Sequence, residues 1–160
     1  MNPMLRNVLA AILGYVVMAL VLFATFSVLW MVLGPAGSFE PGSWDVSSTW
    51  IVGSIVLGFL AALAGGAACG RVQADRRGLF ILMGLVVILG IVAALPEAAE
   101  VAAARPDDVS MTDAMSNAAQ PAWIMWLNPL IGVVGAWLGA GRGGRGAGAT
   151  PAPASPSTEA

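Results

Sequence analysis

Three acidic side chains in the second half of the chain have the type and spacing that could bind a cation. Asp107, Asp108 and Asp113 lie within seven consecutive positions. Calcium takes about six to eight oxygen ligands from a defined loop, and this spacing does not match that pattern. We therefore predict a solvated acidic segment, with a cation site or a partner-binding site on these three residues as the alternative.

The other residues of the chain give no indication of an enzyme. The chain has no His and one Cys, which excludes His/Cys zinc sites, haem ligation by His and Cys–His catalysis within this chain. The sequence contains no visible nucleophile–base pair and no cluster of metal ligands. It therefore predicts a protein that is not an enzyme and that binds no cofactor and no metal.

The composition predicts an integral membrane protein whose main partner is the lipid bilayer. Hydrophobic residues make up 58% of the chain and charged residues 10%, against about 45–50% and about 25% in soluble domains. Carboxylates, Lys, Arg and His inside a membrane mark ion pathways, and the long apolar segments contain none. Their polar residues are Tyr15, Thr25, Ser27, Ser54 and Asn128.

Most of these polar residues are expected to have a structural role. Hydroxyls within a membrane helix usually bond back to their own backbone, which is our interpretation of Thr25, Ser27 and Ser54. The hydroxyl of Tyr15 lies deep enough to require a partner, either another helix or a substrate. The pair Asn128-Pro129 combines a helix kink with an amide that can hydrogen-bond to a neighbouring helix, and a gate or binding role is the alternative.

Small residues recur every four positions in two of the apolar segments. The row in the second segment consists of Ser54, Gly58, Ala62, Gly66 and Gly70. The row in the fourth segment consists of Asn128, Gly132, Ala136 and Ala140, beside the GxxxG step of Gly135 and Gly139. A further row beside the first consists of Ala61, Gly65 and Cys69, so we interpret the cysteine as a packing residue. Small residues let membrane helices approach closely.

These rows predict a specific contact between the two segments. Both segments cross the membrane in the same direction, and parallel GxxxG helices typically cross at about −40°. We expect the first row, from Ser54 to Gly66, to meet Gly132 and Ala136 within one chain near the middle of the membrane. The alternative is that one of the rows faces a second protomer.

Four segments are long enough to form the elements that carry these residues. A bilayer core of about 30 Å requires about 20 apolar residues in a helix, and the segments lie at about residues 8–33, 48–70, 79–95 and 121–140. The first is far longer than the apolar region of a signal peptide, which has about 7–15 residues, and it ends in Gly34-Pro35, so we expect it to remain uncleaved. The predicted fold is an all-α four-helix membrane bundle formed by residues 1–140.

The distribution of charge predicts the orientation of this bundle. Six of the seven arginines lie on one side of the predicted membrane and only Arg105 lies on the other, which places both termini in the cytoplasm. Basic residues that are all Arg, together with abundant Ala and Gly, indicate a bacterial cytoplasmic membrane. Tryptophans are expected at the opposite interface, namely Trp30, Trp44, Trp50, Trp123 and Trp126.

The segments outside the membrane are expected to be short or disordered. Residues 97–104 predict a short helix, and Ser110 with Asp113 resembles a capping box. Residues 141–160 consist of Gly, Ala, Pro, Ser and Thr with two arginines and predict a disordered cytoplasmic tail. Two arginines among glycines are too few for an RNA-binding segment, so no nucleic-acid partner is expected.

The small-residue motifs also carry a resemblance. With GFLAALAGGAACGR at residues 58–71 and NPLIG at residues 128–132, the four spans resemble small, uncharacterised four-span bacterial membrane proteins. The resemblance implies no particular activity. The sequence thus predicts a non-enzymatic structural or accessory protein that packs with itself or with a larger membrane complex. A small channel or facilitator for a neutral solute is the alternative.

Overall fold

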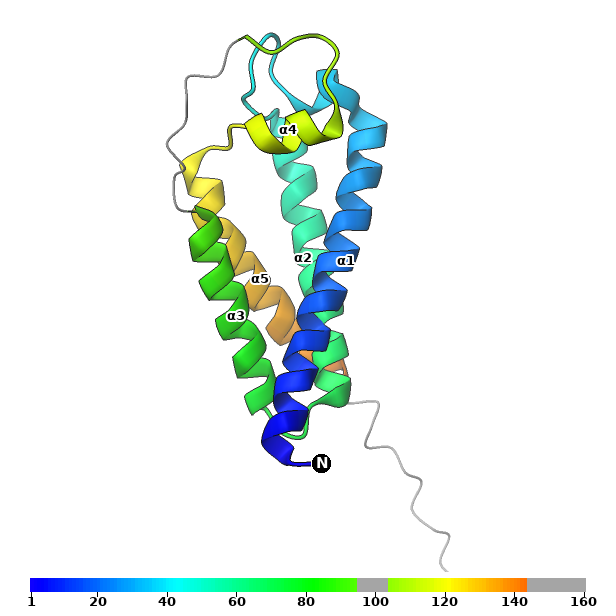
Figure 1. Ribbon diagram of the computed structural model, residues 1–160, viewed down its shortest axis with the longest axis vertical. Coiled ribbons are helices and arrows are strands. Elements are labelled where there is room, and N and C mark those ends of the chain that lie inside the picture. The colour runs from blue at the N-terminus through cyan, green and yellow to red at the C-terminus, as the bar shows by residue number, and fades with distance from the viewer. Residues whose placement is uncertain (95–103, 144–160) are drawn as a thin grey trace, which may run out of the picture.

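The computed structural model describes residues 1–94 and 104–143, and within them the chain is all-helical (Figure 1). The helices are α1 (Pro3–Ser38), α2 (Ser48–Val72), α3 (Arg77–Ala94), α4 (Met111–Asn117) and α5 (Ala122–Gly143). All except α4 are long and apolar enough to cross a membrane, and they correspond to the four predicted segments. The prediction of an all-α fold with four such helices is confirmed.

Two predictions for the segments between and after these helices have a different outcome. The predicted helix at residues 97–104 lies outside the described residues, apart from Ala104, which is not helical. The tail was expected to begin at Gly141, whereas α5 continues to Gly143. The remainder of the tail lies outside the described residues.

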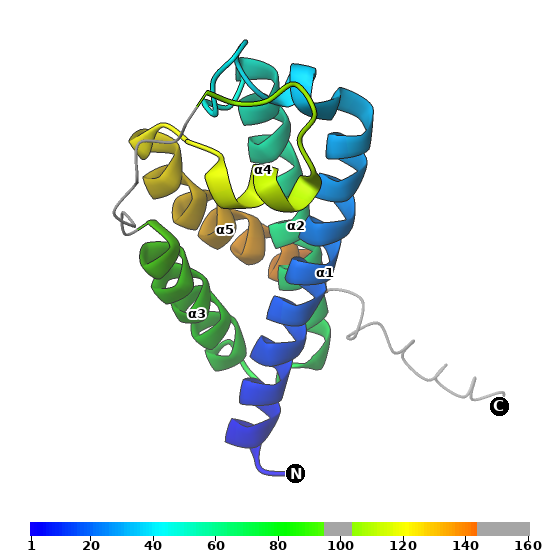
Figure 2. The ribbon, with the colours of Figure 1, turned by 45° about the horizontal axis from the view of Figure 1, so that its top comes forward.

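The helices converge at one end of the bundle and separate toward the other. We call these the terminal end, which carries the N-terminus and the loop between α2 and α3, and the α4 end, which carries α4 (Figures 1 and 2). Near the terminal end, α3 packs on α1, where Leu82 meets Gly14. Toward the α4 end, α3 packs on α5, where Gly90 meets Pro129. Helix α3 therefore crosses the bundle diagonally.

A backbone break ends the long apolar part of α1. Gly34 has φ +59° and ψ −174°, and Pro35 begins one further helical turn that ends at Ser38. Positive φ values are readily adopted by glycine, and proline suits the start of a helical turn. The following loop folds back, since Ser47 N–H donates to the carbonyl of Ser38 at 2.9 Å. Because of this break, the loop after α1 folds across the ends of α1 and α2 at the α4 end.

Helix α4 begins at the predicted capping box. The hydroxyl of Ser110 accepts a hydrogen bond from the backbone N–H of Asp113 at 3.2 Å and donates one to its carboxylate at 2.6 Å. This arrangement satisfies a backbone donor at the start of the helix. The capping prediction is confirmed, and Ala114 on this helix is buried against the cluster that contains Phe39 and Val46.

An aromatic cluster ties the loop at the α4 end to α1 and α2. Trp30 contacts Phe39 and Trp50 edge to face at 6.2 and 6.3 Å between ring centroids, and Phe39 contacts Trp44 at 5.7 Å. The guanidinium of Arg105 lies 5.4 Å from the centroid of Phe39. Aromatic pairs of this geometry stabilise beyond their buried area. Three of the tryptophans expected at the interface therefore pack among themselves and their neighbours, rather than only facing lipid headgroups.

A polar clamp holds the terminal end together. Asn7 is 1% exposed, and its side chain accepts from the backbone N–H of Ala74 at 2.8 Å and donates to the carboxylate of Asp75 at 2.9 Å. The guanidinium of Arg6 donates to the carbonyl of Val72 at 2.6 Å. These bonds fasten the start of α1 to the loop between α2 and α3, so this end of the bundle is fixed by hydrogen bonds as well as by packing.

Candidate functional site

The small-residue rows bring α2 and α5 into backbone contact near the terminal end. A Cβ placed on Gly66 would lie 2.6 Å from Cα of Ala136, and one on Gly70 would lie 2.9 Å from Cα of Ala140. Real Cβ atoms essentially never lie this close to another atom. These two glycines thus have no room for a side chain, because the backbone of α5 occupies that space.

The neighbouring small residues extend this contact on both sides. A Cβ on Gly135 would lie 2.6 Å from Cβ of Ala62, and one on Gly139 would lie 2.9 Å from the backbone N of Ala67. On the other side of α2, a Cβ on Gly65 would lie 2.5 Å from the carbonyl oxygen of Gly14 on α1. Helix α2 is therefore held between two helices by backbone-level contacts.

The halves of the rows nearer to the α4 end do not join this contact. A Cβ on Gly58 would have no neighbour within 4 Å, and one on Gly132 would meet Val86 of α3. The predicted contact of Gly132 with the row of α2 is therefore wrong, and the crossing lies closer to the terminal end than expected. The physical reason is that α3 packs on this part of α5, so α5 leans away from α2 toward the α4 end.

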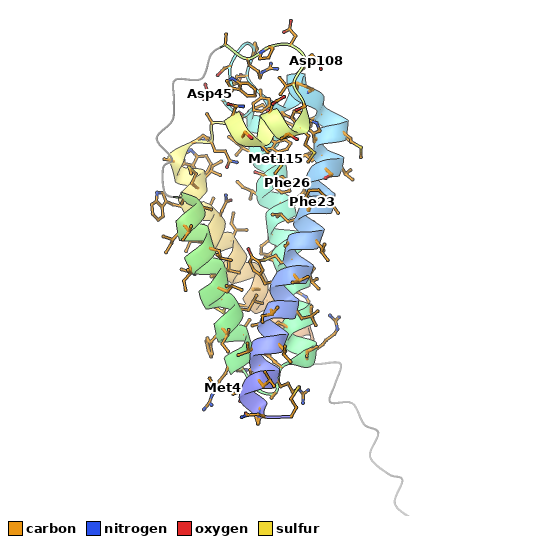
Figure 3. The ribbon with its side chains drawn as sticks, in the orientation of Figure 1. Met4, Phe23, Phe26, Asp45, Asp108 and Met115 are labelled. Carbon is orange, nitrogen blue, oxygen red and sulfur yellow. The ribbon has the colours of Figure 1, made fainter. Side chains whose placement is uncertain are left out.

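Two adjoining open cavities lie between the diverging helices, and we call them together the chamber. The α4 cavity has a volume of about 570 Å³ and lies between α4 and the end of α1. The mid-bundle cavity has a volume of about 400 Å³ and is bounded by the four long helices. Phe23, Phe26 and Met115 lie near the α4 cavity (Figure 3). Both cavities are lined by Ala19, Leu22, Phe26 and Gln120.

Three of the five polar residues predicted within the spans line the mid-bundle cavity, namely Tyr15, Ser54 and Asn128. Ser54 donates back to the carbonyl of Ile51 at 2.8 Å. The backbone bonds predicted for Thr25 and Ser27 are also formed, each at 2.8 Å to the carbonyl four positions earlier. The interpretation of these hydroxyl residues is confirmed.

The other two predicted polar residues of this cavity, which Gln120 also lines, behave differently. The hydroxyl of Tyr15 and the amide of Asn128 form no hydrogen bond with any residue that the structure describes. The interhelical bond predicted for Asn128 is therefore not formed within this part of the chain, because the helices diverge where it lies. Tyr15 is half-buried and Asn128 is exposed, so both groups border the open space between the helices rather than a protein partner.

A third polar group without a hydrogen-bond partner among the described residues lines the α4 cavity. Ser38 is 1% exposed, and its hydroxyl is buried without a hydrogen-bond partner among the described residues. A buried polar group left unpaired costs about 1–3 kcal/mol. No sequence pattern singles out Ser38, because its burial depends on the fold of the chain after the backbone break at Gly34.

The size and the lining of the chamber define the kind of molecule that it suits. Ligand sites commonly have volumes of about 300–1,000 Å³ with apolar walls and a few polar groups. Because no acidic or basic side chain of residues 1–94 or 104–143 lines either cavity, the described walls of the chamber suit an uncharged apolar guest.

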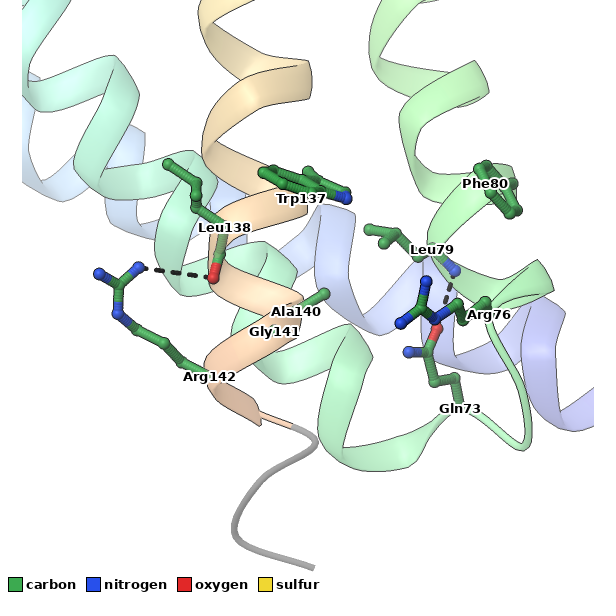
Figure 4. Close-up of a pocket in the computed structure, with 9 residues that line it drawn as sticks. All are labelled: Gln73, Arg76, Leu79, Phe80, Trp137, Leu138, Ala140, Gly141 and Arg142. Carbon is green, nitrogen blue, oxygen red and sulfur yellow. Dashed lines mark hydrogen bonds between the residues drawn. The ribbon is translucent and has the colours of Figure 1, made fainter.

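A second cleft of about 590 Å³ lies between α3 and α5 at the terminal end (Figure 4). Arg76 and Arg142 flank it on opposite sides, and Trp137 lies along its edge. The guanidinium of Arg142 donates to the carbonyl of Leu138 at 3.4 Å, on the side away from Arg76 (Figure 4). The two guanidinium groups do not converge, so they do not form one anion site.

The acidic segment does not form a metal centre within the described residues. Asp107 and Asp108 are exposed at the α4 end (Figure 3, where Asp108 is labelled), and the carboxylate of Asp113 accepts from Ser110. Among residues 1–94 and 104–143, no three His, Cys, Asp or Glu side chains gather in a way that could hold a metal ion. This placement fits the prediction of a solvated acidic segment.

No protein-family model, curated protein or solved structure matches this chain. The resemblance to small four-span bacterial membrane proteins therefore stays a prediction. The fold defines the class of protein: with four candidate membrane-spanning helices, the chain is of the multi-pass helical membrane type.

Proposed function

We propose that this chain is a non-enzymatic integral membrane protein with a structural or accessory role, which packs with itself or with a larger membrane complex. We further propose that it resides in a bacterial cytoplasmic membrane with both termini in the cytoplasm. The observation that carries the accessory role is a continuous apolar stripe on α5. Its members are between 50% and 63% exposed and consist of Trp123, Trp126, Leu130, Val134 and Trp137.

The spacing of this stripe supports its use as a contact face. Steps of three and four residues place all five side chains on one side of a helix with 3.6 residues per turn. The other side of α5 packs on α2 and α3, so the stripe faces outward along the whole length of the helix. Apolar side chains at this spacing commonly form the contacts between long helices.

Affinity purification from native membranes in mild detergent tests the accessory role. We expect wild-type protein to recover a stoichiometric partner or a homo-oligomer. Replacing Leu130 and Val134 together by Ala should weaken that association. The matched control replaces Ile88 and Val92 of α3, which have the same spacing and are 62% and 60% exposed. Recovery of a lone monomer from wild-type membranes, or equal loss in both variants, would refute the proposal.

A facilitator for a neutral solute is the second candidate, and the polar lining of the mid-bundle cavity favours it. Such a path would also have to pass the terminal end, where Gly66 and Ala136 bring α2 and α5 into backbone contact. Transport would therefore require the most tightly packed part of the bundle to open. Glycerol uptake into liposomes above an empty-vesicle control would establish this second function instead of the first.

A further inference from the structure

We propose that the chamber binds an uncharged lipid without a headgroup, whose ketone or hydroxyl oxygen lies in the mid-chain and hydrogen-bonds to Tyr15 and Asn128. The hydrocarbon arms of this guest occupy the mid-bundle cavity and the α4 cavity. This binding site goes beyond the proposed accessory role and does not depend on a protein partner.

Hydrogen-bonding chemistry defines the polar part of the guest. Tyr15 from α1 is half-buried and Asn128 from α5 is exposed; both line the same open cavity, and neither side chain has a hydrogen-bond partner among the described residues. A phenol and a carboxamide both donate to a neutral oxygen. A charged guest is disfavoured, because none of the described residues that line the chamber is acidic or basic and an unpaired charge in hydrocarbon is costly.

The depth of Tyr15 places the bound oxygen below the level of phospholipid esters. Tyr15 lies seven residues after residue 8, where the apolar segment begins beyond Arg6 and Asn7, which corresponds to about 10 Å at 1.5 Å per residue. This is about a third of the way into a hydrocarbon core of about 30 Å. The guest must therefore carry its oxygen within the hydrocarbon.

The roof of the chamber leads to the same conclusion. Ala114 and Met115 of α4 line the α4 cavity, so a headgroup above the chamber would have to displace this helix. The buried hydroxyl of Ser38 lines that cavity without a partner and provides another neutral hydrogen-bonding position. Buried polar groups are paired in most proteins, and a guest in this cavity would pair this one. Because α4 covers this end of the chamber, the guest enters from the side, between two helices.

Glycine positions provide a matched pair of variants for the test. Gly58 lines the mid-bundle cavity, and a Cβ there would have no neighbour within 4 Å, so Gly58→Leu adds a side chain at the cavity wall without a clash at its Cβ. Gly84 on α3 is exposed and equally open, so Gly84→Leu adds the same side chain outside the chamber. Both variants remove a helix-weakening glycine.

The experiment is photolabelling of the full chain in phosphatidylcholine nanodiscs. The probe is a symmetric dialkyl ketone with a diazirine in one arm, and the labelled residues are mapped by mass spectrometry. We expect saturable labelling of α1 near Tyr15 and of α5 near Asn128. Gly58→Leu should reduce it at least tenfold, whereas Gly84→Leu should leave it unchanged. Tyr15→Phe, which keeps the ring, should weaken binding about two- to tenfold through the lost hydrogen bond.

Competition and a second probe distinguish the sources of the oxygen. An unlabelled ketone or secondary alcohol of the same length should compete, and the better competitor identifies the group that is recognised. Equal labelling of wild-type and Gly58→Leu protein would overturn the proposal. A diazirine-bearing phosphatidylcholine that labels the same residues with the same sensitivity to Gly58→Leu would also overturn it, because the guest would then carry a headgroup.

Discussion

The substitution Gly66→Ala tests whether the backbone contact between α2 and α5 holds the bundle together. The added Cβ would lie 2.6 Å from Cα of Ala136, whereas carbon atoms in good contact are about 3.5–4.0 Å apart. The two helices must therefore separate by about 1 Å, and the neighbouring contact of Gly70 with Ala140 resists this separation. Overpacking of this kind costs about 1–3 kcal/mol.

The control for this prediction is Gly58→Ala, two turns earlier on the same row. Its Cβ meets nothing within 4 Å, so the substitution gains up to about 1 kcal/mol of helix propensity without a clash. Gly66→Ala gains the same helix propensity, but the clash of its Cβ with α5 opposes that gain. The two variants should thus differ by about 1–3 kcal/mol in the free energy of unfolding.

Thermal unfolding in one detergent, followed by circular dichroism and by size-exclusion chromatography, measures this difference. For a chain of this size, 1 kcal/mol shifts Tm by about 2–4 °C, so Gly66→Ala should melt about 2–12 °C below Gly58→Ala. Equal melting temperatures would refute the reasoning, because they would mean that the close approach of the two backbones contributes nothing to stability.

Three further predictions concern other parts of the chain. Asn7→Ala should cost about 1–3 kcal/mol, because it leaves the backbone N–H of Ala74 unpaired; unchanged stability in the same thermal assay would count against the polar clamp. Cys69 is fully buried, so a maleimide should label it only after denaturation, and rapid labelling of folded protein would contradict the packing. Cysteines placed at Ser43 and Ser116, but not at Ala74, should react with an impermeant reagent in intact spheroplasts, and the reverse pattern would invert the proposed orientation.

The sequence was most informative where local physics decides the outcome. Hydropathy located the four long helices, and the spacing of Ser110 and Asp113 located the start of α4, because bilayer thickness and helix capping depend on nearby residues alone. The four-residue rows identified the face of each helix but not the height at which the helices cross. That height depends on Val86 of α3 filling the space at Gly132, which is a contact between distant segments.

The candidate site was predictable only in part, for a related reason. Tyr15 and Asn128 stood out as polar residues in apolar segments, but their shared cavity follows from the divergence of the helices. Asn7 gave no signal, since an amide at the start of an apolar segment is equally compatible with exposure to solvent. Its burial depends on the loop at Ala74, nearly seventy positions further along the chain.

The diagonal course of α3 links the two ends of the molecule. Near the α4 end, this helix packs on α5 and stands apart from α1 across the chamber; near the terminal end, it packs on α1 and stands apart from α5 across the second cleft. If α3 pivots about its middle as a rigid rod, so that one end swings toward α1, the other end swings toward α5. The chamber and the cleft then narrow together, so a single mechanical degree of freedom couples spaces at the two ends of the bundle.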